Sequence, residues 1–239
     1  MANGPQLDRN TKGVNRIILV QHCQSQHHLD RDRYFPDSDN GLTELGRAQA
    51  EAVANRVADL TQGAQVRLFS SDMTRARETA EIVAAEIHCK PSFQPELREW
   101  SDPNILEHKT RPEWSDAQAL TRETSSDWTG RLPKEHLFDW RPYDTHETWR
   151  EFLARISAFM DPLANELDEE TLPVLVLHGG SLSNVVVWWL GLPLDSLPDR
   201  YCFGGRPGNI SILKTNRHGN PVIDRLNDTA HLDALGNGV

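Results

Sequence analysis

The chain has 239 residues, enough for one large domain with a substantial core, and its charged (25%) and hydrophobic (38%) fractions are those of an ordinary globular protein. A formal net charge of −10 without an extended basic tract argues against a nucleic-acid partner. We find no apolar run long enough to span a bilayer and no secretory signal, and the three cysteines cannot all pair. We therefore expect a cytoplasmic protein with reduced thiols and no membrane partner.

The first part of the chain predicts a strand, a loop and a helix. An apolar strand over 14–20 is followed by a polar loop over 21–41. From Thr43, apolar residues recur every three or four positions, as in a helix packed on a sheet, and Gly63 ends this pattern.

The same order then repeats. Residues 66–69 predict a second strand, and a helix with one apolar face from Met73 to Ile87 follows it. Ser70 or Ser71 can cap this helix, because a serine hydroxyl accepts from the first free backbone N–H groups. A βαβα order predicts a parallel sheet covered by helices.

The segment from Pro91 to Tyr143 lacks a periodic pattern. It contains four tryptophans: Trp100, Trp114, Trp128 and Trp140. We predict an insertion over about 91–145 that acts as a lid or carries short helices of its own. Its tryptophans either anchor the insertion to the body of the domain or line a substrate pocket.

The second half returns to regular elements. Asp144 and Glu147 have capping-box spacing before a long amphipathic helix, in which Pro162 predicts a bend or a break. The remaining expected elements are a strand over 174–177, a Gly179-Gly180 turn, an apolar helix through 185–190 that stops at Gly191, and a hairpin of strands over 210–214 and 222–226.

Together these elements predict a single α/β domain over 1–239. We expect three layers, α/β/α, around a mostly parallel central sheet. The insertion would form a lid over the carboxyl ends of the strands.

Two histidines directly follow apolar strands. His22 comes after the strand that ends at Val20, and His178 after the strand that ends at Leu177. The carboxyl ends of parallel strands open onto one crevice, so both rings can meet there. An isolated histidine is more often structural, but the repeated pattern favours a shared site.

Six runs of the chain resemble, in order, the motifs of the histidine phosphatases, also called the phosphoglycerate-mutase-like superfamily. The first, Leu19-Val20-Gln21-His22-Cys23-Gln24-Ser25, is similar to Leu-Val-Arg-His-Gly-Gln-Ser. The others are 42–50, 70–80, 97–99, 178–180 and 227–232. They cover both ends of the chain and its core.

The resemblance implies that His22 attacks phosphorus and forms a phosphohistidine. A neutral imidazole has a free lone pair near pH 7, which suits this role. The transferred phosphoryl group spreads negative charge over its oxygens, so cations and donors should surround it. The resemblance assigns this role to Arg75, His178 and the Gly179 N–H group, whereas the alternative for Arg75 is a surface position on a helix.

Glu99 matches the family residue that protonates the leaving oxygen and then activates water. A carboxyl group can serve as this acid near neutrality only if its pKa is raised. The sequence after Glu99 departs from the family pattern, so Glu107 is a rival for the acid.

Gln21 stands where the family has arginine. A guanidinium offers a charged fork to phosphate, whereas glutamine offers one neutral NH₂ group. Losing such a donor costs about 3 kcal/mol of transition-state stabilisation unless another cation replaces it. The candidates for this replacement are His27, His28, Arg31, Arg33, Arg111 and Arg141.

Cys23 and Ser25 of the first motif are also expected to bind the substrate. With Gln21 and Gly179 they make up the expected substrate-binding residues. Cys23 replaces a glycine beside the nucleophile. It is either a tolerated small residue, which we favour, or an oxidation-sensitive thiol.

Three hypotheses follow. The first is a phosphohydrolase, a histidine acid phosphatase-type phosphomonoesterase that acts on a small phosphorylated metabolite and is weakened or altered by Gln21. The second is a phosphomutase of the same chemistry. The third is a divergent relative that binds a ligand, or performs acid–base chemistry on a non-phosphate substrate.

No cofactor is implied. The His27-His28 pair and the scattered carboxylates lack a recognisable metal-ligand spacing, and a histidine nucleophile needs no divalent ion. The expected partner is a small, phosphorylated substrate, and a homodimer is compatible with the sequence.

Overall fold

The computed structural model describes residues 14–29, 39–100, 139, 145–168, 170–192 and 202–235. Most of the predicted insertion, and with it the expected lid, lies outside the described residues. So do the following residues singled out above: Arg31, Arg33, Glu107, Arg111, Trp114, Trp128, Trp140, Arg141, Tyr143 and Asp144.

The described strands form one sheet. They are β1 (Arg16–Gln21), β2 (Gln65–Ser70), β3 (Ser92–Phe93), β4 (Thr171–Leu177), β5 (Ile210–Thr215) and β6 (Pro221–Asp228). Their order in the sheet is β3-β2-β4-β1-β5-β6. The first four strands in this order are parallel, β5 is antiparallel to β1, and β6 is antiparallel to β5. The predicted mostly parallel sheet is therefore confirmed.

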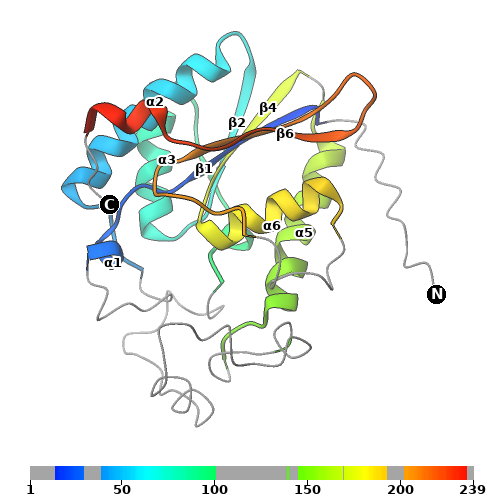
Figure 1. Ribbon diagram of the computed structural model, residues 1–239, viewed down its shortest axis with the longest axis horizontal. Helices are drawn as coiled ribbons and strands as arrows, with labels where there is room; N and C mark the ends of the chain where they lie inside the picture. The colour runs from blue at the N-terminus through cyan, green and yellow to red at the C-terminus, as the bar shows by residue number, and fades with distance from the viewer. Residues whose placement is uncertain are drawn as a thin grey trace.

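The helices cover both faces of this sheet. They are α1 (Gln26–Leu29), α2 (Glu44–Thr61), α3 (Thr74–Glu86), α5 (Trp149–Glu166) and α6 (Gly179–Leu190), with 3-10 helices η2 (Pro95–Leu97) and η5 (Ala230–Leu235). Figure 1 shows α2 and α3 on one side of the sheet and α5 and α6 on the other. This is the expected three-layer α/β/α arrangement.

Strand β1 shows why the layers form. Ile18 and Val20 pack into the core beneath α2 and α3, whereas Ile17 and Leu19 pack into the core beneath α5 and α6. Successive side chains of a strand point to opposite faces, so a continuous apolar strand is buried on both. The two cores hold the carboxyl ends of β1 and β4 rigidly side by side.

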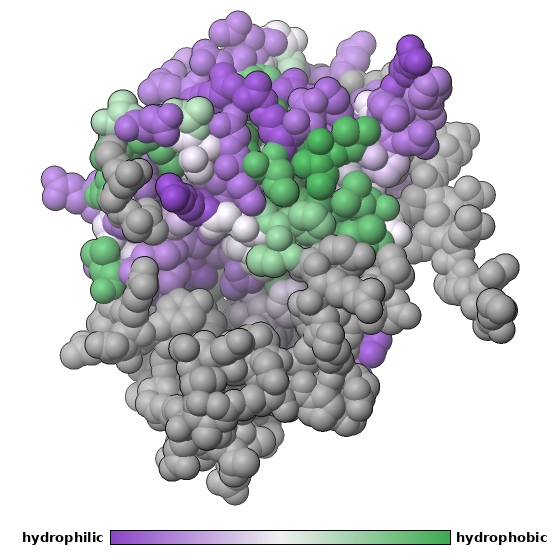
Figure 2. All heavy atoms as spheres, viewed as in Figure 1, coloured by the Kyte–Doolittle hydropathy of each residue, from purple (hydrophilic) through white to green (hydrophobic). Residues whose placement is uncertain are grey.

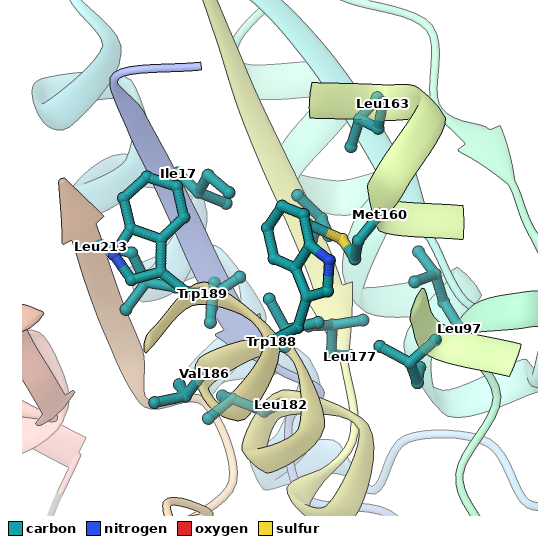
Figure 3. Close-up of a cluster of buried hydrophobic side chains, with 14 of the residues drawn as sticks. Ile17, Leu97, Met160, Leu163, Leu177, Leu182, Val186, Trp188, Trp189 and Leu213 are labelled. Carbon is teal, nitrogen blue, oxygen red and sulfur yellow. The ribbon is translucent and has the colours of Figure 1, made fainter. Parts of the chain in front are cut away.

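Helix α6 contributes two tryptophans to the second core. Figure 3 shows Trp189 beside Ile17 and Leu213, and Trp188 beside Met160 of α5. The Trp188 indole N–H donates to the Asp161 carboxylate at 2.7 Å, which satisfies a buried donor. This packing fixes the direction of α6, whose N-cap residue is His178.

Helix starts differ most from the sequence prediction. Neither Ser70 nor Ser71 caps α3; instead the Asp39 carboxylate accepts from the Thr74 N–H (2.5 Å) and the Thr74 hydroxyl (2.7 Å). The loop that precedes α2 supplies this cap, so no local pattern could reveal it.

Helix α5 also begins differently. Its capping box is Thr148 with Glu151 instead of Asp144 with Glu147, and the helix runs through Pro162 without a break. The proline removes one backbone donor, but the core packing of α5 keeps the helix continuous through it.

Three further predictions were wrong in detail. Gly179 and Gly180 are the first turn of α6 instead of a free turn, the polar loop contains α1, and the aperiodic segment contains the strand β3. The same segment contains η2, a short helix of the kind expected there. Such short elements depend on pairing with the body of the domain, so their own sequence carries little signal. Gly191, by contrast, ends α6 as predicted, in the left-handed conformation (φ 63°) that favours glycine.

Within the described ranges, no helix combines the length and apolar character needed to cross a membrane. Figure 2 shows hydrophobic residues gathered on one face of the molecule, over the region of α6 and β6. The structure contains one chain, and the homodimer stays a prediction.

Candidate active site

His22 follows β1, and its ring is fixed at both nitrogens. It is 3% exposed, its Nδ1 donates to the Cys23 carbonyl at 2.8 Å, and the Arg75 Nε–H donates to its Nε2 at 3.1 Å. A carbonyl only accepts and a guanidinium only donates, so the proton is on Nδ1 and the lone pair on Nε2. Burial, and then the positive charge of Arg75, lower the pKa of His22 well below its usual value. Nε2 is therefore an unprotonated nitrogen at neutral pH.

His178 lies opposite, with its ring centroid 5.0 Å from that of His22. Its Nε2 is 2.8 Å from the Ser71 hydroxyl oxygen, and that oxygen also accepts from the Met73 N–H at 3.3 Å. Nδ1 of His178 is buried without a hydrogen-bond partner. An oxygen ligand could satisfy this atom, because a Ser71 hydroxyl that donates to Nε2 leaves the ring proton on Nδ1.

Arg75 lies in the first turn of α3. The residue is 2% exposed, which excludes the alternative of a surface arginine. Its positive charge acts on His22, His178 and Glu99, and it lowers the pKa of each. For His178, as for His22, burial is the larger cause of the lowered pKa. His22, His178 and Glu99, all predicted from the sequence, are therefore close enough to Arg75 for its charge to shift their pKa values.

Glu99 follows η2 and reaches the first turn of α6. Its carboxylate accepts from the Gly180 N–H and from the Trp100 N–H, both at 2.8 Å. Burial raises the pKa of Glu99, although the two N–H donors and Arg75 oppose this shift. A Cβ at position 180 would be 2.2 Å from Oε1 of Glu99, so the carboxylate can occupy this place only beside a glycine.

Arg155 on α5 holds the segment that carries Glu99. Its guanidinium donates to the main-chain carbonyls of Glu96 (2.7 Å), Arg98 (3.1 Å) and Glu99 (3.2 Å). The Glu147 carboxylate accepts from it on the other side, through Nε at 3.0 Å and through Nη2. We call Arg155 and Glu147 the clamp. The sequence analysis missed Arg155, because main-chain acceptors leave no signal in side-chain patterns.

Gln21 ends β1 beside the site, and the protein uses its amide oxygen. Oε1 accepts from the Asn209 side-chain amide at 2.8 Å and from the Gly205 N–H at 3.2 Å. Its Nε2 lies 3.9 Å from where a Cβ of Gly179 would be. An arginine has no acceptor, so it could not make the first two bonds. Asn209 is another residue that the sequence analysis missed.

Ser25 connects His27 and His28 to the nucleophile loop. Its hydroxyl oxygen is 2.7 Å from Nδ1 of His27, and its N–H donates to Nδ1 of His28 at 3.1 Å. The two rings are stacked, 3.9 Å apart, and their centroids are 5.7 and 5.6 Å from that of His22. The structure therefore brings both histidines, proposed as substitutes for an arginine, to the site.

Cys23 is fully buried, and its N–H donates to the Thr79 hydroxyl at 3.1 Å. Burial raises the pKa of its thiol to about 12. Oxidation requires a thiolate that reagents can reach, so this environment favours the small structural residue over the oxidation-sensitive thiol.

Within the part of the chain that the structure describes, no group of three or more His, Cys, Asp or Glu side chains is arranged to hold a metal ion. The four histidine rings at the site instead surround a cation, Arg75, whose charge lowers the pKa of each of them. The positive charge of Arg75 favours an anion at this place.

Comparison with known proteins agrees with this geometry. The sequence profile of the histidine phosphatase superfamily (branch 1) matches residues 17–229. A protein of Erwinia tasmaniensis named probable phosphoglycerate mutase GpmB is 30% identical over 226 residues, which cover 91% of this chain and 95% of that protein. An Escherichia coli protein of the same name is 29% identical over 227 residues, 92% of this chain and 95% of its own.

Solved structures share the fold. A mycobacterial glucosyl-3-phosphoglycerate phosphatase, in complex with inorganic phosphate, has a TM-score of 0.65 at 24% identity and covers 91% of this chain and 99% of its own. A putative alpha-ribazole-5'-P phosphatase from Escherichia coli has a TM-score of 0.65 at 21% identity, covering 90% and 97%. The α/β fold predicted from the sequence is thus that of known phosphatases.

Proposed function

The chain belongs to the histidine phosphatase superfamily (branch 1), and from this premise we propose that it hydrolyses phosphomonoesters of small metabolites through a phosphohistidine at His22. One observation carries the proposal. Nδ1 of His22 donates to the Cys23 carbonyl, and the unprotonated Nε2 accepts from the Arg75 guanidinium. The nucleophilic nitrogen is therefore buried beside a positive charge that attracts an anion.

In the first step, Nε2 of His22 attacks phosphorus in line with the ester oxygen. The N–P bond forms as the P–O bond breaks, and the oxygen leaves with its electron pair. Arg75 and a proton on Nδ1 of His178 stabilise the charge on the phosphoryl oxygens. The buried Nδ1 of His178 supports this role, because a phosphoryl oxygen would be the acceptor that the described part of the chain does not supply.

Glu99 donates its proton to the leaving oxygen in this step. The carboxylate that results then takes a proton from water as the water oxygen attacks phosphorus and the N–P bond breaks. Burial, which raises the pKa of Glu99, supports the acid role. The rival acid, Glu107, lies outside the described residues.

The substrate class rests on the site and on the names of similar proteins. Phosphatases among the solved structures act on phosphorylated small molecules, and relatives of about 30% identity are named phosphoglycerate mutases. The second candidate is therefore a mutase, which would return the phosphoryl group from His22 to the substrate before water attacks.

The test begins with p-nitrophenyl phosphate and 3-phosphoglycerate as substrates. Release of nitrophenol together with inorganic phosphate, through an acid-labile phosphoenzyme, is the expected result. ³¹P NMR of the phosphoglycerate reaction distinguishes the two candidates: free phosphate supports the hydrolase, and an isomeric phosphoglycerate supports the mutase. A protein inactive on these and on a panel of sugar and alcohol phosphates would favour the ligand-binding alternative.

A further inference from the structure

We propose that the stacked pair His27 and His28 is the anion-binding element that replaces an arginine at position 21, and that it takes up a proton when the anion binds. The inference rests on the proposed function, because the anion is the phosphoryl group of the substrate. Gln21 cannot supply a charge, and its amide oxygen is bound to Asn209 and Gly205.

The position of the pair carries the first step. Both ring centroids are within 5.7 Å of the His22 centroid, so a phosphoryl group on Nε2 of His22 would lie within reach of the two rings. Ser25 is fully buried and bonds both rings through their Nδ1 atoms, so the pair is held in place from the chain side.

The orientation of the rings carries the second step. Nδ1 of His28 lies 3.1 Å from the Ser25 nitrogen and 3.3 Å from the Ser25 carbonyl oxygen, and Nδ1 of His27 lies 2.7 Å from the Ser25 hydroxyl oxygen. Both Nδ1 atoms thus face Ser25, so Nε2 of each ring is at the far edge. A ring that takes up a proton carries N–H groups on both nitrogens, and its Nε2–H can then donate to a phosphoryl oxygen.

Charge carries the third step. The groups that face the pair from other elements are Arg75 at the start of α3, His22 at the end of β1 and His178 at the end of β4. Burial, Arg75 and His28 lower the pKa of His27 to about 3, and burial is also the main cause of the lowered pKa of His28. Both shifts favour the neutral form of the rings when no anion is bound.

A bound dianion reverses this balance. It neutralises the effect of Arg75 and favours the charged form of a ring that contacts it, so the pKa of the pair rises. Where the raised pKa exceeds the pH of the solution, binding takes up a proton. Binding therefore strengthens as the pH falls. An arginine at position 21 would have no such dependence, because it is charged at every pH of interest.

The experiment uses sulfate as the probe. Sulfate remains a dianion between pH 4 and 9, so any proton taken up on binding comes from the buffer and is bound by a protein group. Calorimetry at pH 6 in two buffers of different ionisation enthalpy gives the affinity and the number of protons taken up. The proteins compared are wild type, the double variant His27→Gln/His28→Asn, and His218→Gln. His218 is an exposed histidine in the β5–β6 turn and serves as the matched control.

We expect the wild type and His218→Gln to bind sulfate with proton uptake. The double variant should bind about tenfold to a hundredfold more weakly and without uptake, since hydrogen bonds to a charged group have this magnitude. Thermal unfolding of all three proteins verifies that they are folded. The difference in proton uptake between the wild type and the double variant assigns the titration to the pair, because His22 and His178 are present in both.

Sulfate binding that is equally tight in the double variant, or binding by the wild type without proton uptake, would overturn the inference. Failure of the proposed function is a separate result. If the wild type binds sulfate through the pair with proton uptake but hydrolyses no phosphomonoester, the inference about the pair stands and the proposed phosphatase function is wrong.

Discussion

The nucleophile and the acid are held in two different ways. His22 and His178 follow adjacent parallel strands and are almost fully buried, so the sheet itself sets their positions. Glu99 lies on an irregular segment after η2, held by side-chain and main-chain hydrogen bonds from Arg155 and Gly180. We call His22 and His178 the strand-end wall of the site, and Glu99 the opposite wall. The position of the strand-end wall depends on the core of the domain, whereas the position of the opposite wall depends on a few specific contacts. Substitutions at the two walls should therefore differ in kind.

The largest effect is expected at the strand-end wall. His22→Ala should fold but lose about 10⁴-fold or more in kcat, because the variant lacks the imidazole nitrogen that would attack phosphorus. The measurement is p-nitrophenyl phosphate turnover together with detection of the phosphoenzyme. His22→Gln is a second variant, whose amide oxygen can still accept from Arg75. Wild-type turnover by either folded variant would refute the nucleophile assignment.

At the opposite wall, Glu99→Gln should separate substrates by their leaving groups. The amide cannot deliver a proton, so alkyl phosphates should lose far more in kcat/KM than p-nitrophenyl phosphate, whose leaving group departs as an anion. The ratio of the two losses is measured. Equal losses would show that Glu99 only binds or positions.

Gly180→Ala offers the same test without touching the carboxyl group. Its new Cβ would displace the Glu99 carboxylate, so the same leaving-group dependence is expected. Gly179→Ala controls for a glycine-to-alanine change in the same turn, because its Cβ would meet only the Gln21 amide, at 3.9 Å or more.

The pH profile follows from both walls. Activity requires neutral His22, whose pKa is lowered chiefly by burial, and protonated Glu99, whose pKa burial raises. Activity should rise with pH as His22 loses its proton and fall as Glu99 loses its own, which gives a bell-shaped profile of kcat/KM. In Glu99→Gln the alkaline limb should disappear. If the alkaline limb persists in Glu99→Gln, it arises from the titration of a group other than Glu99.

A smaller effect is expected from the clamp. Arg155→Met should lower kcat/KM by about tenfold and move the alkaline limb to higher pH. The positive charge of Arg155 lowers the pKa of Glu99, and its removal lets that pKa rise. Arg155→Lys keeps the charge but not the planar fork, so it should lose activity with a smaller shift of the limb. Loss of activity with an unmoved limb in both variants would indicate a purely structural role.

The smallest effect is expected for Gln21→Arg. Alone, it should change kcat/KM by less than about tenfold if the histidine pair already supplies the missing donors. In the His27→Gln/His28→Asn background it should raise kcat/KM by up to about a hundredfold. It should also lower the free energy of unfolding by about 1–3 kcal/mol, because the buried Asn209 side-chain amide loses its Gln21 acceptor. A hundredfold gain in the wild-type background would show that the pair does not replace the arginine.

Sequence patterns predicted the parts of the fold that repeat. The apolar strands before His22 and His178, the one-sided helices and the glycine stop at Gly191 all follow from local periodicity and backbone preference. Helix starts were harder. The cap of α3 comes from Asp39, which is distant in sequence, and the short elements α1, β3 and η2 are too small for any period to appear.

By itself, the sequence determined the α/β class, the sheet with its strand-end histidines, and the motif residues Arg75, Glu99 and Gly179. Only the tertiary structure decided which ring nitrogen of His22 carries the proton, that Ser71 bonds His178, and that Arg155 holds Glu99. The physical reason is the range of the interactions. Periodicity records which face of an element is buried, whereas a hydrogen bond between distant segments depends on where the fold brings two atoms together.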